Sequence, residues 1–221
     1  ALPAGRAPHW SSYQDWVAQG YAADMHYLAR PDALVKRQDP RRIMPDAKTV
    51  MVVAASYAGP PTPQLPRLSG RVSRYVWGPP EKARIDYHQW MLDRLEALIE
   101  RLEVAVGQGI AARTYVDTGP ILERDWAQAG GLGWIGKNTT LINPALGSYT
   151  FLGSALLDVA LPAPPIHQLP SCGTCTRCLD ACPTGALVSP GVLDARRCLS
   201  YLTIENRGPI PEQFREAVGT R

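Results

Sequence analysis

The run CGTCTRCLDACP, residues Cys172 to Pro183, holds four of the five cysteines of the chain. Its spacing is Cys-x-x-Cys-x-x-Cys-x-x-x-Cys-Pro, and the fifth cysteine is Cys198. Soft thiolates at such short intervals let one loop wrap one iron–sulfur cluster, and a final Cys-Pro is typical of two-cluster ferredoxins. Structural zinc sites usually combine two separated ligand pairs, so zinc fits less well. The run predicts a ferredoxin-like module with five metal ligands: Cys172, Cys175, Cys178, Cys182 and Cys198.

The number of cysteines does not match the number of ligands that two clusters require. Two [4Fe–4S] clusters need about eight thiolates, and this sequence has five. One expectation is that the chain is truncated and lacks a second cysteine run. The alternative is a single cluster that takes Cys182 or Cys198 as its fourth ligand. We favour truncation, because the sequence ends on the open helical pattern REAVGTR (215–221).

Composition and charge exclude several classes of protein. The 221 residues carry a net charge of only +3, which argues against a uniformly basic surface for nucleic acid. No apolar run is long enough to span a bilayer, and the first nine residues lack the pattern of a secretory signal. The cysteines form one cluster rather than a spread disulfide framework. We therefore expect a cytoplasmic protein with no membrane association.

Residues 1–161 show the mixed pattern of an α+β sheet domain. The apolar run KTVMVVAASY (48–57) predicts a strand buried on both faces, and residues 85–106 repeat apolar side chains at helical spacing. A short helix is predicted from Ser11, broken near Gly20 and stopped by Pro31. The other predicted elements are a strand over 112–117, a helix over 120–131, and strands over 139–143 and 148–161. A proline-rich linker begins at residue 162, so the predicted ferredoxin-like module occupies residues 162–221.

The stretch VDTGPILERDWAQAGGLGWIGKNTTLI (116–142) is the most unusual part of the sheet domain. It places Asp117 at the end of a strand and beside a helix N-terminus, where the helix dipole favours an anion. The glycines that follow would let the backbone approach a ligand closely; they are Gly130, Gly131, Gly133 and Gly136. An aspartate in this place is also a common helix cap. The residues alone therefore leave the ligand site and the simple cap as equal alternatives.

Six segments resemble the epoxyqueuosine reductase family. They are RQDPRRIMPDAKTV (37–50), IDYHQWM (85–91), DTGPILERDWAQAGGLGWIGKNTTLI (117–142), GSYTFLGSALLD (147–158), CGTCTRCLDACPTGAL (172–187) and CLSYLTIENRGPIP (198–211). The resemblance implies an oxidoreductase that uses cobalamin and two [4Fe–4S] clusters to reduce epoxyqueuosine in tRNA to queuosine. It implies a nitroreductase-like α+β cobalamin-binding domain followed by the ferredoxin-like module. A second cysteine run and a helical-repeat tail would follow in the family and are missing from this sequence.

The same resemblance assigns roles to individual residues. Asp117 matches the position of the proton donor, a role for which burial beside the corrin would keep the carboxyl protonated. Cys172, Cys175 and Cys178 would hold the cluster nearer cobalamin, whereas Cys182 and Cys198 would belong to the second cluster. The residues that would line the corrin are Asp86, Tyr87, His88, Asp117, Lys137, Asn138, Thr139, Leu141 and Ser200.

Two features of the sequence are misleading if taken alone. DYHQWM (86–91) begins like the Asp-x-His-x-x-Gly signature in which a histidine binds cobalt, but Met91 replaces the glycine. The resemblance implies cobalamin without a protein ligand below cobalt, so we do not expect His88 to bind the metal. The basic run KRQDPRR (36–42) would suit a phosphate backbone, but we expect an ordinary solvated face. Trp126 and Trp134 are expected in the core rather than against a cofactor.

Two other functions fit parts of this sequence. A reductive dehalogenase would use the same cofactors on a halogenated small molecule, but such enzymes typically carry a twin-Arg export signal and lack the Asp-Thr-Gly-Pro arrangement. A ferredoxin-like electron-transfer protein would need no catalytic site, and cobalamin binding would exclude it. For the favoured function we expect a monomer whose partners are tRNA with epoxyqueuosine in the anticodon loop and an unidentified electron donor.

Overall fold

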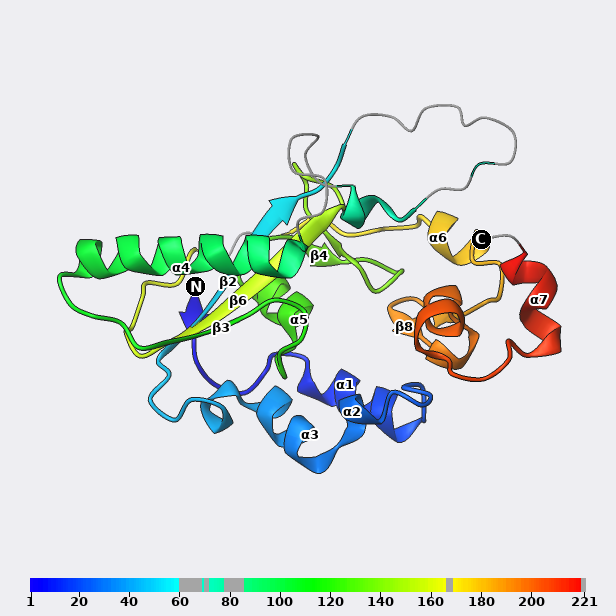
Figure 1. Ribbon diagram of the computed structural model, residues 1–221, viewed down its shortest axis with the longest axis horizontal. Helices are drawn as coiled ribbons and strands as arrows, with labels where there is room; N and C mark the ends of the chain where they lie inside the picture. Colours follow the sequence, from blue (N-terminus) through cyan, green and yellow to red (C-terminus); the bar gives the residue numbers. More distant parts are fainter. Residues whose placement is uncertain (60–68, 70–71, 78–85, 166–168, 220–221) are drawn as a thin grey trace.

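A central sheet of four antiparallel strands organises the protein, in the order β1–β2–β6–β3 (Figure 1). The computed structural model describes residues 1–59, 69, 72–77, 86–165 and 169–219. The strands are β1 (Leu2–Pro3), β2 (Thr49–Ser56), β6 (Thr150–Leu157) and β3 (Ala112–Tyr115). The pairing of β2 with β6 is continuous, from Thr49 opposite Leu157 to Ser56 opposite Thr150. The α+β class and the strand predicted over 48–57 are confirmed.

Both faces of this sheet are covered, which explains the uninterrupted apolar run in β2. Side chains alternate between faces along a strand. Met51 and Leu157 belong to the core cluster on one face, and Val50 and Leu156 belong to the cluster on the other. Polar residues at either set of positions would face a packed layer rather than water.

The helix α4 (Tyr87–Val106) covers the first face. The Asp86 side chain caps it by accepting the backbone N–H of His88, and Gly107 ends it in the left-handed conformation with φ of 75°. Its buried residues are Met91, Leu95 and Ile99. The helix predicted over 85–106 is confirmed from Tyr87 onward, and Ile85 lies outside the described residues.

The second face is covered by α5 (Glu123–Ala129) and by the N-terminal helices. These helices are α1 (Trp10–Ala18), α2 (His26–Ala29), α3 (Pro31–Gln38) and the 3-10 turn η1 (Pro40–Arg42). The predicted break near Gly20 and the stop at Pro31 are confirmed, since α1 ends at Ala18 and α2 ends at Ala29. Pro31 is also the first residue of α3, a helix that the sequence analysis did not predict. Proline is favoured at the first helical position, where its missing N–H has no intrahelical partner to lose.

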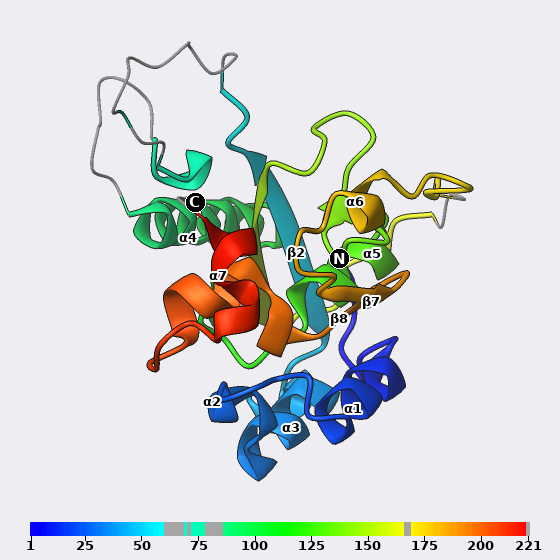
Figure 2. The same ribbon diagram turned by 90° about the vertical axis from the view of Figure 1, so that its right-hand side faces the viewer.

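The cysteine-containing part packs against the N-terminal helices rather than standing apart (Figure 2). Its elements are α6 (Arg177–Asp180), β7 (Leu187–Ser189), β8 (Val192–Leu193), η4 (Ala195–Arg197), the π-helical turn η5 (Tyr201–Glu205) and α7 (Glu212–Val218). The Trp16 indole N–H donates to the Leu193 carbonyl at 2.6 Å. The buried Tyr201 hydroxyl donates to the Asp24 carboxylate at 2.9 Å.

Smaller elements complete the described structure. A hairpin of β4 (Trp134–Ile135) and β5 (Leu141–Ile142) follows α5, and the 3-10 turn η2 (Arg74–Val76) precedes α4. Among the described helices, none is both long and apolar enough to cross a membrane. The nitroreductase-like and ferredoxin-like details, and the domain boundary near Leu161, stay predictions.

The contact between α4 and the sheet should carry a large share of the stability. Leu95 is 1 % exposed, and its side chain approaches the backbone of Gly153 in β6. We expect Leu95→Ala to lower the free energy of unfolding by about 2–5 kcal/mol, through lost burial and the cavity left behind. Urea unfolding followed by circular dichroism measures the change.

Val104 provides the matched control, because it lies on the same helix and is 85 % exposed. Val104→Ala should change the free energy of unfolding by no more than about 0.5 kcal/mol. Equal effects of the two substitutions would show that α4 is not held by this packing.

Candidate active site at the end of strand β3

Asp117 lies two residues beyond β3, at the start of the loop that leads to α5. Its φ is 59°, a left-handed conformation that is uncommon for any residue with a side chain. The Tyr87 hydroxyl donates to Asp117 Oδ2 at 3.2 Å, and His88 Nε2 lies 3.6 Å from the same oxygen. The structure therefore brings together the start of α4 and the end of β3, which are 30 residues apart in the sequence.

The exposure of Asp117 differs from the sequence-based expectation. The side chain is 68 % exposed, so the protein atoms by themselves do not provide the expected burial. Asp86, the cap of α4, is exposed to the same degree, and its carboxylate contacts His88 Nδ1 at 2.6 Å.

Aromatic rings support the Tyr87 side of this site. Tyr87 stacks on Phe151 of β6, with ring centroids 4.4 Å apart and an interplanar angle of 7°. Phe151 in turn stacks on Tyr57, and Tyr75 meets Tyr87 edge-on. Burial, followed by the nearby Asp117 carboxylate, raises the pKa of Tyr87. The phenol therefore stays protonated at neutral pH and acts as a hydrogen-bond donor.

Glu123, the first residue of α5, lies on the other side of Asp117. Its Oε1 accepts the backbone N–H of Asp117 at 3.1 Å. Burial raises the pKa of the Glu123 carboxyl to about 7. The Asp117 N–H, Arg124 and His88 oppose this shift, whereas the Asp117 carboxylate adds to it. The site thus contains a carboxyl group that titrates near neutral pH.

Arg124 connects this region to the hairpin of β4 and β5. Its guanidinium donates to the Thr139 carbonyl at 2.5 Å, and Thr139 has a positive φ of 65°. The guanidinium reaches solvent, yet many protein atoms surround it, and the resulting desolvation lowers its pKa. In the same turn, the Asn138 side chain accepts the Thr140 N–H at 3.2 Å. Leu141, the first residue of β5 in this hairpin, is buried, with only 2 % of its surface exposed.

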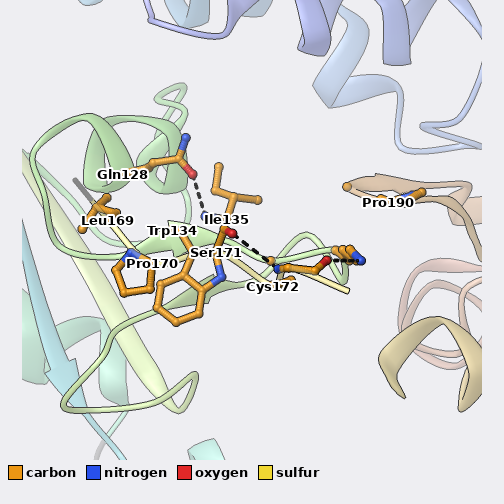
Figure 3. A pocket seen from close by; sticks show the side chains of 12 residues that line it. Gln128, Trp134, Ile135, Leu169, Pro170, Ser171, Cys172 and Pro190 are labelled. Atoms are coloured by element: carbon orange, nitrogen blue, oxygen red, sulfur yellow. Dashed lines mark hydrogen bonds between the residues drawn. The ribbon is translucent and has the colours of Figure 1, made fainter. Parts of the chain in front are cut away.

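Lys137 links the hairpin to the cysteine run. Its Nζ donates to the Gly173 carbonyl at 2.8 Å, and its own carbonyl accepts the Gly191 N–H at 2.9 Å. A cavity of about 590 Å³ opens at this junction (Figure 3). The lining residues are Gln128, Trp134, Ile135, Gly136, Lys137, Leu169, Pro170, Ser171, Cys172, Gly173, Pro190 and Gly191.

None of the five cysteines forms a disulfide in the described part of the chain. The described residues include no group of three or more His, Cys, Asp or Glu side chains arranged to hold a metal ion. The buried Trp134 indole N–H has no partner within strict hydrogen-bonding distance among the described residues. It is nevertheless the main cause that lowers the pKa of the Cys172 thiol, with help from Lys137. This donor and the soft thiols suit a negatively charged iron–sulfur cluster.

The predicted site residues fall into three groups. Asp86, Tyr87, His88 and Asp117 are in contact with one another. Lys137, Asn138, Thr139 and Leu141 share the hairpin, which Arg124 ties to α5. Ser200 precedes η5 and is exposed. The turn that follows it contains Glu205, whose carboxylate accepts the Tyr27 hydroxyl at 3.3 Å.

Sequence reasoning missed Glu123 and Arg124. Their neighbours along the chain were quoted as an unusual stretch, but a charged pair at the start of a helix is common on protein surfaces. Only the fold shows that the two side chains reach backward and forward along the sequence to Asp117 and Thr139.

Comparison with known proteins first defines a class. Residues 171–221 match the family model of a 4Fe-4S double cluster binding domain, so this is an iron–sulfur protein with an α+β sheet part. Residues 37–118 match the family model described as epoxyqueuosine reductase QueG, DUF1730. A relative from Synechocystis sp., described as an epoxyqueuosine reductase, is 44 % identical over 197 residues, which are 89 % of this chain and 64 % of the relative.

Solved structures agree with this assignment. An epoxyqueuosine reductase with an epoxyqueuosine-modified tRNA-Tyr stem loop has a TM-score of 0.83 and 32 % identity, covering all of this chain and 56 % of its own. An epoxyqueuosine reductase from Bacillus subtilis, described with its catalytic aspartate loop swung out of the active site, has a TM-score of 0.75 and 30 % identity over the same shares. This chain belongs to the epoxyqueuosine reductase family, and it spans less than two thirds of the length of these relatives.

The pKa of Glu123 has a consequence for stability. Its value in the folded protein, about 7, lies above its ordinary value of 4.5. The folded state therefore holds this proton more tightly than the unfolded chain, and the associated stability is lost as pH rises from about 5 through 7. Glu123→Gln keeps an oxygen acceptor and removes the charge.

We expect the melting temperature of Glu123→Gln to match that of the wild type near pH 5 and to exceed it at pH 8. Thermal melts of both proteins across this pH range measure the difference. Curves that stay parallel from pH 5 to 8 would contradict the raised pKa.

Proposed function

We propose that this chain reduces epoxyqueuosine in tRNA to queuosine, with cobalamin as cofactor and Asp117 as proton donor. The observation that carries the proposal is the Asp117 carboxylate, held beside a tyrosine and a histidine at a strand end, in a chain of this family. Related proteins support the substrate, since one solved relative is described with an epoxyqueuosine-modified tRNA stem loop. The catalytic aspartate loop described for the Bacillus subtilis relative supports a role for an aspartate on a loop.

The residues around Asp117 fit a cobalamin without a protein ligand to cobalt. Both ring nitrogens of His88 already face carboxylates, Nδ1 that of Asp86 and Nε2 that of Asp117. The tilted ring of His88 lies against Tyr87, which leaves an aromatic and acidic surface rather than a free imidazole. When bound, cobalamin would supply a strongly reducing cobalt centre. The residues proposed to line the corrin are Asp86, Tyr87, His88, Asp117, Lys137, Asn138, Thr139, Leu141 and Ser200.

Protonation of the substrate is the step we assign to the protein. Opening an epoxide leaves charge on oxygen, and a proton must reach that oxygen as the bond breaks. Asp117 Oδ2 is the proposed donor atom. The Tyr87 hydroxyl donates to that oxygen and His88 Nε2 lies 3.6 Å from it, so these two side chains can hold the Asp117 carboxyl group in place. Bound cofactor and substrate would cover the side chain, which the protein alone leaves exposed.

The cysteine part is proposed to deliver electrons to this site. Cys172, Cys175 and Cys178 would bind the nearer [4Fe–4S] cluster, with Cys182 and Cys198 assigned to the second. Lys137 supports this path, because it belongs to the hairpin that carries Thr139 and its Nζ donates to the carbonyl of Gly173, the residue after Cys172. The electron donor is unidentified, and we propose that the chain acts as a cytoplasmic monomer with a domain boundary near residue 161.

Asp117→Asn tests the proposal most directly. The substitution keeps the size of the side chain and removes its proton, so turnover should fall by about 10²–10⁴-fold while corrinoid binding persists. The assay uses the chain loaded with cobalamin, a chemical reductant such as Ti(III) citrate, and an RNA stem loop that contains epoxyqueuosine. Mass spectrometry of the nucleosides measures queuosine, and the visible spectrum measures bound corrinoid.

Asp158 provides the control. Like Asp117 it is an aspartate just beyond the end of a sheet strand, but it follows β6 at the opposite end of the sheet, where its carboxylate accepts the Ala111 backbone N–H at 2.9 Å. Asp158→Asn should leave turnover close to that of the wild type. A near wild-type rate for Asp117→Asn would mean that the proton comes from another group.

A further inference from the structure

Two of the site's backbone positions adopt a conformation that needs support. Three non-glycine residues in the described ranges have positive φ: Ala23 at 50°, Asp117 at 59° and Thr139 at 65°. Such a conformation persists only when surrounding contacts hold it, and it is frequent at active sites. Asp117 and Thr139 belong to the two loops that the proposed function places around the cofactor.

Consecutive side chains of α5 hold these two positions. Glu123 Oε1 accepts the N–H of Asp117 at 3.1 Å, and Arg124 Nη1 donates to the carbonyl of Thr139 at 2.5 Å. The two bonds are charge-assisted when both side chains are ionised, and such bonds are stronger than neutral ones. Each bond holds the backbone of its loop and does not involve the side chain of Asp117 or Thr139.

The helix α5, which carries both Glu123 and Arg124, is itself held in place by its packing. The next residues of α5, Asp125, Trp126 and Ala127, are buried against the sheet. Asp125 also accepts the backbone N–H of His9 at 3.0 Å and contacts the His9 ring, which fastens α5 to the N-terminal segment. Anchors on a rigid element can hold a site more closely than contacts between two loops.

We propose that Glu123 and Arg124 are positioning residues, which together clamp the Asp117 loop and the Thr139 hairpin in the geometry needed for reduction. The inference rests on the proposed function only in taking the Asp117 loop and the Thr139 hairpin to surround the cofactor and substrate. The clamp itself is a property of the protein chain, so it can be measured without cofactor or substrate.

Hydrogen exchange measured by mass spectrometry tests the clamp in the chain without corrinoid. Glu123→Leu should speed exchange in residues 116–122 roughly tenfold or more, because the Asp117 N–H loses its carboxyl acceptor. Exchange in residues 137–141 should change little in this variant. Arg124→Leu should show the reverse pattern. Glu123→Ala removes the same acceptor and replaces the Leu variant if that protein does not fold.

Turnover of the cobalamin-loaded chain supplies the second readout. Glu123→Leu should lower kcat about 10²-fold with little change in KM for the stem loop, since misplacing a reacting group by about 1 Å has an effect of this size. Glu123→Gln retains an oxygen for the Asp117 N–H and should restore most of kcat and of the exchange protection. Glu103→Leu is the control, because Glu103 Oε1 accepts the Ile110 N–H at 2.8 Å beyond the far end of α4.

The possible results separate the clamp from the proposed function. Unchanged exchange at residues 116–122 in Glu123→Leu, or equal loss in the Leu and Gln variants, overturns the clamp. Equal loss of kcat in Glu103→Leu also overturns it, because the effect would then be one of general stability. Wild-type chain that forms no queuosine overturns the proposed function, and the exchange comparison still decides the clamp.

Discussion

Eight consecutive residue pairs join β2 to β6, and the rest of the structure depends on this pairing. Because both strands are apolar on both faces, the sheet requires a layer on each side. α4 covers one face and α5 the other, with the N-terminal helices beside α5. β3 pairs with the other edge of β6, so its end lies between the two layers. Asp117 is placed there by the packing of the sheet.

The site then follows from where three elements start or stop. α4 begins at Tyr87, β3 ends before Asp117, and α5 begins at Glu123, so side chains from each reach the same point. The residue that caps α4 also orients His88, since Asp86 Oδ1 accepts the His88 backbone N–H and lies 2.6 Å from Nδ1 of the His88 ring. A single residue thus performs a structural and a site-forming role. A substitution at Asp86 would therefore affect both the start of α4 and the contacts of His88.

The cysteine part is attached at two places with different chemistry. Aromatic and aliphatic side chains, with the Tyr201–Asp24 hydrogen bond, join it to the N-terminal helices. Two hydrogen bonds join it to the hairpin that follows α5, one from Lys137 Nζ to the Gly173 carbonyl and one from the Gly191 N–H to the Lys137 carbonyl. The second attachment brings Cys172 and Trp134 to one cavity (Figure 3). The cysteine part and the sheet are thereby linked through a few residues of one hairpin.

The sequence by itself determined the elements with strong local patterns. The apolar run of β2, the helical period of α4 and the cysteine spacing each reflect short-range chemistry, and motif resemblance pointed to the family and to Asp117. The stop at Pro31 was predicted correctly, but the helix that begins there was missed, because a proline that stops one helix can also be the first residue of the next. The tertiary structure alone decided the contacts of Tyr87, Glu123 and Arg124 with the site, and the exposure of Asp117. These contacts and this exposure depend on how segments that are far apart in the sequence pack together. No local pattern of residues encodes such packing.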